Sequence, residues 1–309
     1  MTDTVSQIRI ATRTSALALW QAHYIADRLR QLVPGIAVEL AHIKSSGDVN
    51  QVSPLREFGG TGAFTKEVQE PVLEGTAELA VHSLKDLPTE SVDGLCLAAV
   101  PERAPRLDAI LLANSSADAP DVDSLQEGAR VGTGSPRRQA QLLHQRPDLR
   151  MLEIRGNVDT RIQKLKDGEY DAIVLAEAGL RRLELADEIS FLLGPPAMLP
   201  AVGQGALGIE CRSDDNKTQE LLSRLTDADA YDCVSAERSL LRALQAGCHA
   251  PLGAWTELDG DQLSLTGVLL SPDGTTRLEA TAKGTRATAA DLGSDVACQL
   301  ITAGGQEWL

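Results

Sequence analysis

The first two-thirds of the chain alternates between short apolar segments, typical of buried strands, and longer segments with the periodicity of amphipathic helices. A predicted strand at 7–12 is followed by a predicted helix at 15–32, which stops before Pro34 and Gly35. The same rhythm continues as far as a helix that begins near Glu177. It predicts an α/β fold with mainly parallel sheets covered by helices on both faces.

Two proline-rich segments, 101–106 and 194–200, interrupt this rhythm, and we interpret them as crossings between two lobes. A cleft between such lobes is a usual place for a ligand. Beyond residue 221, helices are predicted at 228–245 and from 287 to about 302, with strands at 253–258, 263–270 and 276–281, which indicates a small α+β domain with an antiparallel sheet. The predicted domains are lobe 1 (1–101 and 202–219), lobe 2 (107–197) and a C-terminal domain (222–309).

The composition argues against several classes of protein. A net charge of −15 disfavours a nucleic-acid binder, and no segment has the length of a membrane span or the pattern of a signal peptide. Five cysteines without a C-x-x-C, and five histidines without ligand spacing, predict neither a disulfide framework nor a metal site. We therefore expect a cytoplasmic protein with no bound metal.

Positive charge gathers in one segment of this acidic chain. Residues 131–182 contain ten Lys and Arg against seven Asp and Glu. Within it, Ser135 and Pro136 suit the start of a helix, and two arginines follow them, which indicates an anion site. Arginines also flank a second predicted helix start at 155–161, and a third basic group is the doublet Arg181-Arg182. The alternative is an ordinary solvated helix face.

A second motif, 82–88, follows a strand of lobe 1. Pro88 disfavours a helical Leu87, so we expect Lys85 and Asp86 to lie on a loop. An Asp in a cleft can stabilise a developing cation or move a proton, although a surface Lys–Asp pair is the simpler interpretation.

A third motif joins the predicted helix 228–245 to the C-terminal strands. Gly247 is a natural helix stop, and Cys248 and His249 follow it. A loop cysteine is more often reactive than a buried one, and a Cys–His nucleophile is conceivable. The other four cysteines lie in apolar patterns and are expected to pack in the core.

Seven motifs, in this order and spacing, resemble the hydroxymethylbilane synthase (porphobilinogen deaminase) family from Ile8 to about Leu300. They are IATRTSALALWQA (10–22), GAFTKE (62–67), AVHSLKDLP (80–88), VGTGSPRRQ (131–139), RGNVDTR (155–161), LPAVGQGALGIE (199–210) and AERSLLRALQAGCHAP (236–251). The resemblance implies two lobes like those of type II periplasmic-binding proteins, plus the third domain.

The resemblance also implies an activity, the stepwise deaminative joining of four porphobilinogen molecules, and a dipyrromethane cofactor bound covalently to Cys248 through a thioether. It implies that Asp86 is the catalytic carboxylate and that the protein is a monomer. The implied cofactor contacts are Ser83, Lys85, Thr133, Ser135, Arg137, Arg138 and Arg155. The implied substrate contacts are Arg13, Ser15, Phe64, Arg155, Arg161, Arg182 and Gln204.

Some positions depart from the family pattern. Glu57 and Thr61 stand where Lys is common, on a loop expected to cover the cleft, and Gln245-Ala246 replaces the usual Glu-Gly. Three alternatives stay open: a two-lobed anion-binding protein without catalysis, a hydrolase or transferase that uses Cys248 and His249, and a weakly active synthase.

Overall fold

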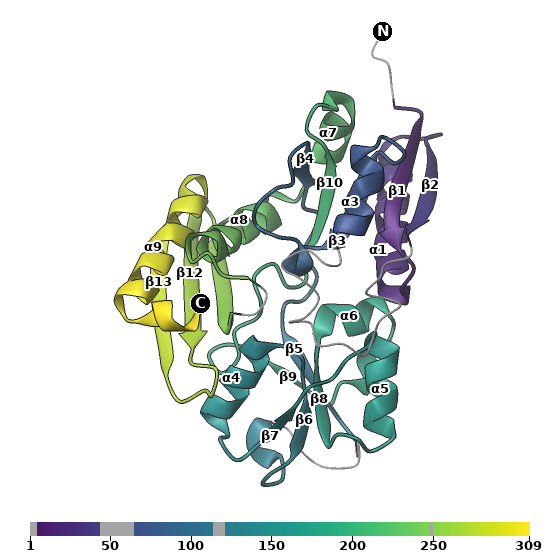
Figure 1. Cartoon of the computed structure of the whole chain (residues 1–309). Coiled ribbons are helices and arrows are strands. Elements are labelled where there is room, and N and C mark those ends of the chain that lie inside the picture. The colour runs from purple at the N-terminus through teal and green to yellow at the C-terminus, as the bar shows by residue number, and fades with distance from the viewer. Residues whose placement is uncertain (1–4, 44–64, 114–120, 248–249) are drawn as a thin grey trace. The chain divides into compact units, whose positions relative to one another are not determined.

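The computed structural model describes residues 5–43, 65–113, 121–247 and 250–309 (Figure 1). Contacts divide the chain into two units, of which the first holds residues 1–103 and 206–231 and the second holds 104–205 and 232–309. The division into three domains stays a prediction. Within the described residues, no helix is both long and apolar enough to cross a membrane.

A five-stranded sheet with the order β2-β1-β3-β10-β4 forms the centre of unit 1. Strand β1 is parallel to β2 and β3, whereas β10 is antiparallel to β3 and β4. Helix α1 buries residues 22, 25, 26 and 29, a spacing that places one apolar stripe against the sheet. The strands are β1 (Gln7–Arg13), β2 (Ala37–Ile43), β3 (Leu79–Ser83), β4 (Leu95–Ala99) and β10 (Leu207–Arg212), and the helices are α1 (Ala16–Leu32), α3 (Lys66–Leu73) and α7 (Asn216–Ser223).

Unit 2 contains a second five-stranded sheet, with the order β7-β6-β8-β5-β9. Strand β6 is parallel to β7 and β8, and β5 is antiparallel to β8 and β9. The strands are β5 (Asp108–Leu112), β6 (Arg130–Gly132), β7 (Arg150–Leu152), β8 (Ala172–Ala176) and β9 (Phe191–Leu193), and the helices are α4 (Pro136–Gln145), α5 (Val158–Lys166) and α6 (Glu177–Arg182).

The same unit ends in a three-stranded antiparallel sheet, β11-β12-β13. Leucines and valines of α8 and α9 share one buried cluster with leucines of this sheet, so both helices pack on it. The elements are α8 (Ala228–Ala243), whose first residues belong to unit 1, β11 (Leu252–Asp259), β12 (Gln262–Leu270), β13 (Arg277–Thr285) and α9 (Ala289–Thr302).

The predicted α/β class is confirmed: two lobes with mainly parallel sheets and a small antiparallel domain with helices. Each large sheet also contains an antiparallel strand, β10 or β5. Strand β9 and helix α7 were not predicted from the sequence pattern. Pro71 lies inside α3 rather than ending it, because only two helical residues follow it and few backbone hydrogen bonds depend on it.

Two local predictions were wrong. Lys85 and Asp86 belong to a single turn of 3-10 helix, Leu84–Asp86, although Leu87 is extended as expected before a proline. Helix α8 ends at Ala243, and Gln245, not Gly247, adopts the left-handed conformation with φ +51°. The N–H groups of Gln245 and Ala246 donate to Arg242 and Leu241 carbonyls, which completes the helix end before Gly247 is reached.

Candidate active site

The carboxylate of Asp86 lies at the carboxyl end of a buried strand in unit 1. Strand β3 is buried along nearly all its length, and the turn that follows it is fixed where the Leu84 N–H donates to the Ala206 carbonyl at 3.0 Å. Leu84 is itself buried, whereas Asp86 is exposed. A buried anchor therefore presents an accessible carboxylate.

Neighbouring predicted contacts in unit 1 lie at strand and helix ends. Arg13 is the last residue of β1, and Ser15 caps α1 by accepting a hydrogen bond from the Ala18 N–H at 3.4 Å. At the end of β3, the Ser83 hydroxyl accepts a hydrogen bond from the Gln21 amide of α1 at 2.8 Å. The Ser83 oxygen is thereby fixed to helix α1.

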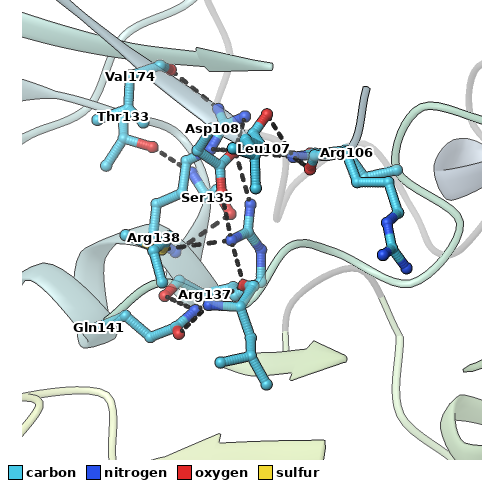
Figure 2. A network of polar contacts seen from close by, with 12 residues as sticks. Arg106, Leu107, Asp108, Thr133, Ser135, Arg137, Arg138, Gln141 and Val174 are labelled. Carbon is cyan, nitrogen blue, oxygen red and sulfur yellow. Dashed lines mark hydrogen bonds and ion pairs between the residues drawn. The ribbon is translucent and has the colours of Figure 1, made fainter. Parts of the chain in front are cut away.

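In unit 2 the structure brings Arg137 and Arg138 together around one carboxylate, that of Asp108 (Figure 2). Gln204 contacts the same carboxylate. Arg137 donates from Nη1 to Oδ2 at 2.7 Å and from Nη2 to Oδ1 at 3.2 Å. Arg138 approaches Oδ1 with Nε at 2.9 Å and Nη2 at 2.7 Å. The Gln204 amide donates to the same oxygen at 3.0 Å. All four side chains are buried.

The ionisation of this cluster follows from its contacts. Burial alone would raise the pKa of Asp108, but the Arg137 and Arg138 guanidiniums and the hydrogen bonds from Arg137 and Gln204 outweigh it and hold that pKa well below its usual range. Burial lowers the pKa of Arg138, and Asp108 opposes that effect. Because an arginine stays protonated, the two guanidiniums and one carboxylate leave an excess positive charge.

The start of α4 contributes side chains more than free backbone donors. Ser135 caps the helix and Pro136 follows, as predicted. The Ser135 N–H donates to the Thr133 hydroxyl at 3.2 Å, and the Arg138 N–H donates to the Ser135 hydroxyl at 3.5 Å. These two N–H groups already have acceptors within the chain, so they are not free donors at this helix start.

The remaining predicted arginines lie on other connections of unit 2. Arg155 forms an ion pair with Glu153, and the Arg161 Nε donates to the Gly156 carbonyl at 2.7 Å. Asn157 occupies the capping position of α5, but its side chain makes no capping bond. Arg182, at the end of α6, is buried and donates to the Gly205 carbonyl at 2.7 Å, beside the Gln204 of the cluster.

Several predicted residues lie outside the described part of the chain: Phe64, Cys248 and His249, and the departures Glu57 and Thr61. Asp108, in contrast, was missed by the sequence analysis. It begins the apolar strand DAILL directly after a proline-rich crossing. A carboxylate at the start of a buried strand needs a charged partner, because an unpaired buried charge is costly. An aspartate next to an apolar strand was therefore the signal in the sequence that could have indicated a buried ion pair.

The donors in unit 2 fit a ligand with several carboxylates, such as the dipyrromethane cofactor that the resemblance implies. The Nε of Arg137 is buried and has no hydrogen-bond partner among the described residues. An unsatisfied buried donor beside excess positive charge is costly unless an anion binds nearby. Guanidinium groups bind carboxylates with short, directional hydrogen bonds.

Comparisons with known proteins agree along nearly the whole chain. Residues 8–220 match the dipyromethane cofactor binding domain of porphobilinogen deaminase, and residues 231–302 match the C-terminal domain of the same enzyme. The chain is 46% identical to the porphobilinogen deaminase of Trichlorobacter lovleyi over 97% of this chain and 95% of that one. It is also 46% identical to the porphobilinogen deaminase of Maridesulfovibrio salexigens, over 98% and 97%.

Among solved structures, a putative periplasmic sulfonate-binding protein from Methylobacillus flagellatus covers 79% of this chain and 69% of its own, with 14% identity and a TM-score of 0.41. A similarity at that level supports no conclusion about ligand or activity. The sequence matches, by contrast, cover both the cofactor-binding part and the C-terminal part at high identity. This chain belongs to the porphobilinogen deaminase family.

Proposed function

We propose that the chain joins four porphobilinogen molecules, with loss of ammonia, on a dipyrromethane cofactor, and releases hydroxymethylbilane. The activity is that of a transferase of tetrapyrrole biosynthesis. The observation that carries it is the family match, which extends over residues 8–220 and 231–302 at 46% identity to curated relatives. The excess positive charge around Asp108 supports it independently, because each pyrrole unit carries an acetate and a propionate.

Asp86 is the catalytic carboxylate in this proposal. The amino group of the substrate's aminomethyl substituent leaves as ammonia when its C–N bond breaks, and the methylene carbon that stays on the pyrrole becomes a cation. A carboxylate stabilises that cation and accepts or returns the pyrrole proton. The exposed position of Asp86 on a turn fixed by buried Leu84 supports this role. The cofactor, when bound, supplies the pyrrole carbon from which the chain grows.

The cationic and hydroxyl groups bind the carboxylates of the ligands. Buried Arg137 and Arg138 hold the cofactor, and the excess charge that they share with Asp108 supports that role. The other cofactor contacts that we propose are Ser83, Lys85, Thr133, Ser135 and Arg155. The substrate contacts that we propose are Arg13, Ser15, Phe64, Arg155, Arg161, Arg182 and Gln204.

Cys248 carries the cofactor through a thioether, a bond that water does not readily cleave while the product is released. The test is the intact mass of protein purified from a host that makes porphobilinogen. We expect the wild type to carry the mass of one dipyrromethane and Cys248→Ala to lack it. Cys298→Ala, which removes an exposed thiol elsewhere, is the control and should keep the added mass.

The catalytic role is tested by Asp86→Asn, which keeps the size of the side chain and removes its charge. Turnover of porphobilinogen should fall at least about 100-fold, the usual scale for losing an acid–base group, while the cofactor mass stays. Asp93→Asn, at another exposed aspartate of the same unit, should have wild-type turnover. Near-normal turnover in Asp86→Asn would remove this residue from the mechanism.

Intact mass, turnover and the alkylation of Cys248 together separate the alternatives. A binding protein without catalysis leaves porphobilinogen unconsumed, and a cysteine hydrolase shows a free, rapidly alkylated thiol at Cys248. A weakly active synthase carries the cofactor but turns over slowly. We further propose that the protein is a cytoplasmic monomer, which sedimentation and cell fractionation test.

A further inference from the structure

We propose that Asp108 is a positioning residue that holds the guanidiniums of Arg137 and Arg138 where they bind the carboxylates of the cofactor. The inference rests on the proposed function, because it assumes that these two arginines are cofactor contacts. Asp108 itself is fully buried, and its carboxylate is already saturated by donors from this chain. It therefore acts through the arginines rather than on the ligand.

The first argument is geometric. Arginine side chains lose roughly 2 kcal/mol of rotamer entropy when they are fixed, so an arginine that is already ordered binds an anion at lower cost. Asp108 fixes both guanidiniums by contacts of 2.7 to 3.2 Å, and two backbone carbonyls complete the arrangement. Leu199 accepts from Arg137 at 2.7 Å, and Val174 accepts from Arg138 at 2.9 Å.

The second argument is electrostatic. Without Asp108, two permanent positive charges would lie side by side in a buried site, and each would drive the other away. With it, the pair keeps a single excess charge and a defined position. The buried Nε of Arg137, which has no partner among the described residues, shows that donor capacity is left after Asp108 is satisfied.

The third argument is the position of Asp108 in the chain. It is the first residue of β5, whereas both arginines are in the first turn of α4. Gln204 binds Asp108 and also donates to the Arg106 carbonyl at 2.8 Å, so the segment before β5 and the segment before β10 meet at this carboxylate. Asp108 thus joins three segments of unit 2: the start of β5, the segment before β10 and the start of α4.

The test compares Asp108→Asn with Asp148→Asn. Asp148 forms a two-contact ion pair with Arg146, just beyond the other end of the same helix, at 2.7 Å for each contact. Asp148→Asn loses one Arg–Asp pair of unit 2, whereas Asp108→Asn loses two and is the variant that releases the proposed cofactor arginines. Each protein is purified from a host that makes porphobilinogen, and the folded fraction that carries the cofactor mass is measured.

We expect the cofactor-bearing fraction of folded Asp108→Asn to fall about tenfold, as expected for misplaced charge-assisted hydrogen bonds. Assembly of the cofactor after porphobilinogen is added to the remaining unmodified protein should slow as well. Asp148→Asn should lose thermal stability but keep the wild-type fraction. Equal fractions in the two variants would show that Asp108 is merely structural.

If Asp108→Asn does not fold, Asp108→Glu decides, since it keeps the charge and moves it by one methylene. A reduced cofactor-bearing fraction in that variant supports positioning, and a wild-type fraction with lowered stability overturns it. Failure of the proposed function looks different, because the wild type itself would then carry no added mass and would leave porphobilinogen unconsumed.

Discussion

The two large sheets have the same strand arrangement but different buried charges. The strand orders are β2-β1-β3-β10-β4 and β7-β6-β8-β5-β9. In each order the second strand lies between two parallel neighbours, and the third pairs with an antiparallel strand that is followed by an edge strand. The antiparallel strand is β10 in one and β5 in the other, and each carries a buried carboxylate, Glu210 or Asp108.

The partners of these two carboxylates differ. Glu210 accepts a hydrogen bond from the Gln69 amide at 2.7 Å and lies 3.0 Å from the His82 Nε2, although no well-aligned hydrogen bond joins His82 to it. Asp108 is bound by two arginines. A histidine can be neutral, whereas an arginine cannot, so only the second sheet has an obligatory excess of positive charge.

This difference indicates a division of labour on one topology. Unit 1 presents an exposed carboxylate, Asp86, after β3, and its buried pair can exist without net charge. Unit 2 keeps fixed positive charge beside the start of α4. The carboxylate that we propose as catalytic and the arginines that we propose as cofactor contacts therefore belong to separate units.

The largest expected effect comes from removing the carboxylate that the arginines share. Asp108→Ala leaves two buried guanidiniums without a counter-charge, so the free energy of unfolding should fall by about 3–5 kcal/mol. Urea denaturation of wild type and variant measures it. A loss below about 1 kcal/mol would mean that water or a rearranged partner replaces the carboxylate at low cost, and the contrast between the sheets would disappear.

The pH dependence of the free energy of unfolding tests the same difference between the buried carboxylates of the two sheets. Because the pKa of Asp108 is lower in the folded protein, its contribution is complete above the unfolded value of about 3.9 and is lost as the pH falls below it. One such group changes the free energy of unfolding by at most about 1.4 kcal/mol per pH unit. Denaturation between pH 5 and pH 2, roughly the range of carboxylate titration, should show a shallower decline in Asp108→Asn than in wild type.

Glu210→Gln is the matched change in unit 1 and should cost less, about 1–2 kcal/mol, because an amide can still accept the hydrogen bond from Gln69. The free energy of unfolding from urea denaturation is again the measurement. A loss as large as that of Asp108→Ala would contradict the difference between the two sheets, because the charge of Glu210 would then matter as much as that of Asp108.

The sequence predicted helices and strands better than it predicted how the strands pair and which buried charges meet. Strand and helix periodicity predicted the first strand and helix of unit 1 and the alternation that continues to α6, because burial imposes a local pattern. It could not show that β10 and β5 run antiparallel to their neighbours, since strand direction depends on which segment the returning chain meets. Nor could it pair Asp108 with Arg137, which lies 29 positions later on a different element.

In the candidate site, too, the local features were predicted correctly, whereas others were not. The capping residues Ser135 and Pro136 were predicted correctly because helix starts have local rules. Gly247 was expected to end α8, but Gln245 takes the left-handed position, because the helix stops where its hydrogen bonds to Leu241 and Arg242 are completed. The roles of Arg155 and Arg161 stay predictions. Phe64 and Cys248 lie outside the described residues, so their roles stay predictions as well.

Three helices, α3 of unit 1 and α5 and α6 of unit 2, end in the same way, and a change at one of these ends has the smallest expected effect. Helix α3 is closed by Gly75 and α5 by Gly168, with φ +72° and +79°, whereas α6 is closed by Glu184 with φ +60°. In all three, the left-handed residue and the next one donate to carbonyls three and five positions earlier. Glu184 is exposed and bears the strain that glycine avoids.

Glu184→Gly should therefore raise the free energy of unfolding by about 0.5 kcal/mol, since relief of left-handed strain slightly exceeds the added freedom of the unfolded chain. Gly168→Ala should lower it by about 1 kcal/mol, and because a Cβ there meets no atom within 4 Å, the loss measures backbone strain alone. Ala303→Gly, at a helix end with φ −76°, is the control and should be destabilising. If Glu184→Gly also loses stability, the end of α6 is held by contacts of the Glu184 side chain rather than by the helix-end motif that it shares with α3 and α5.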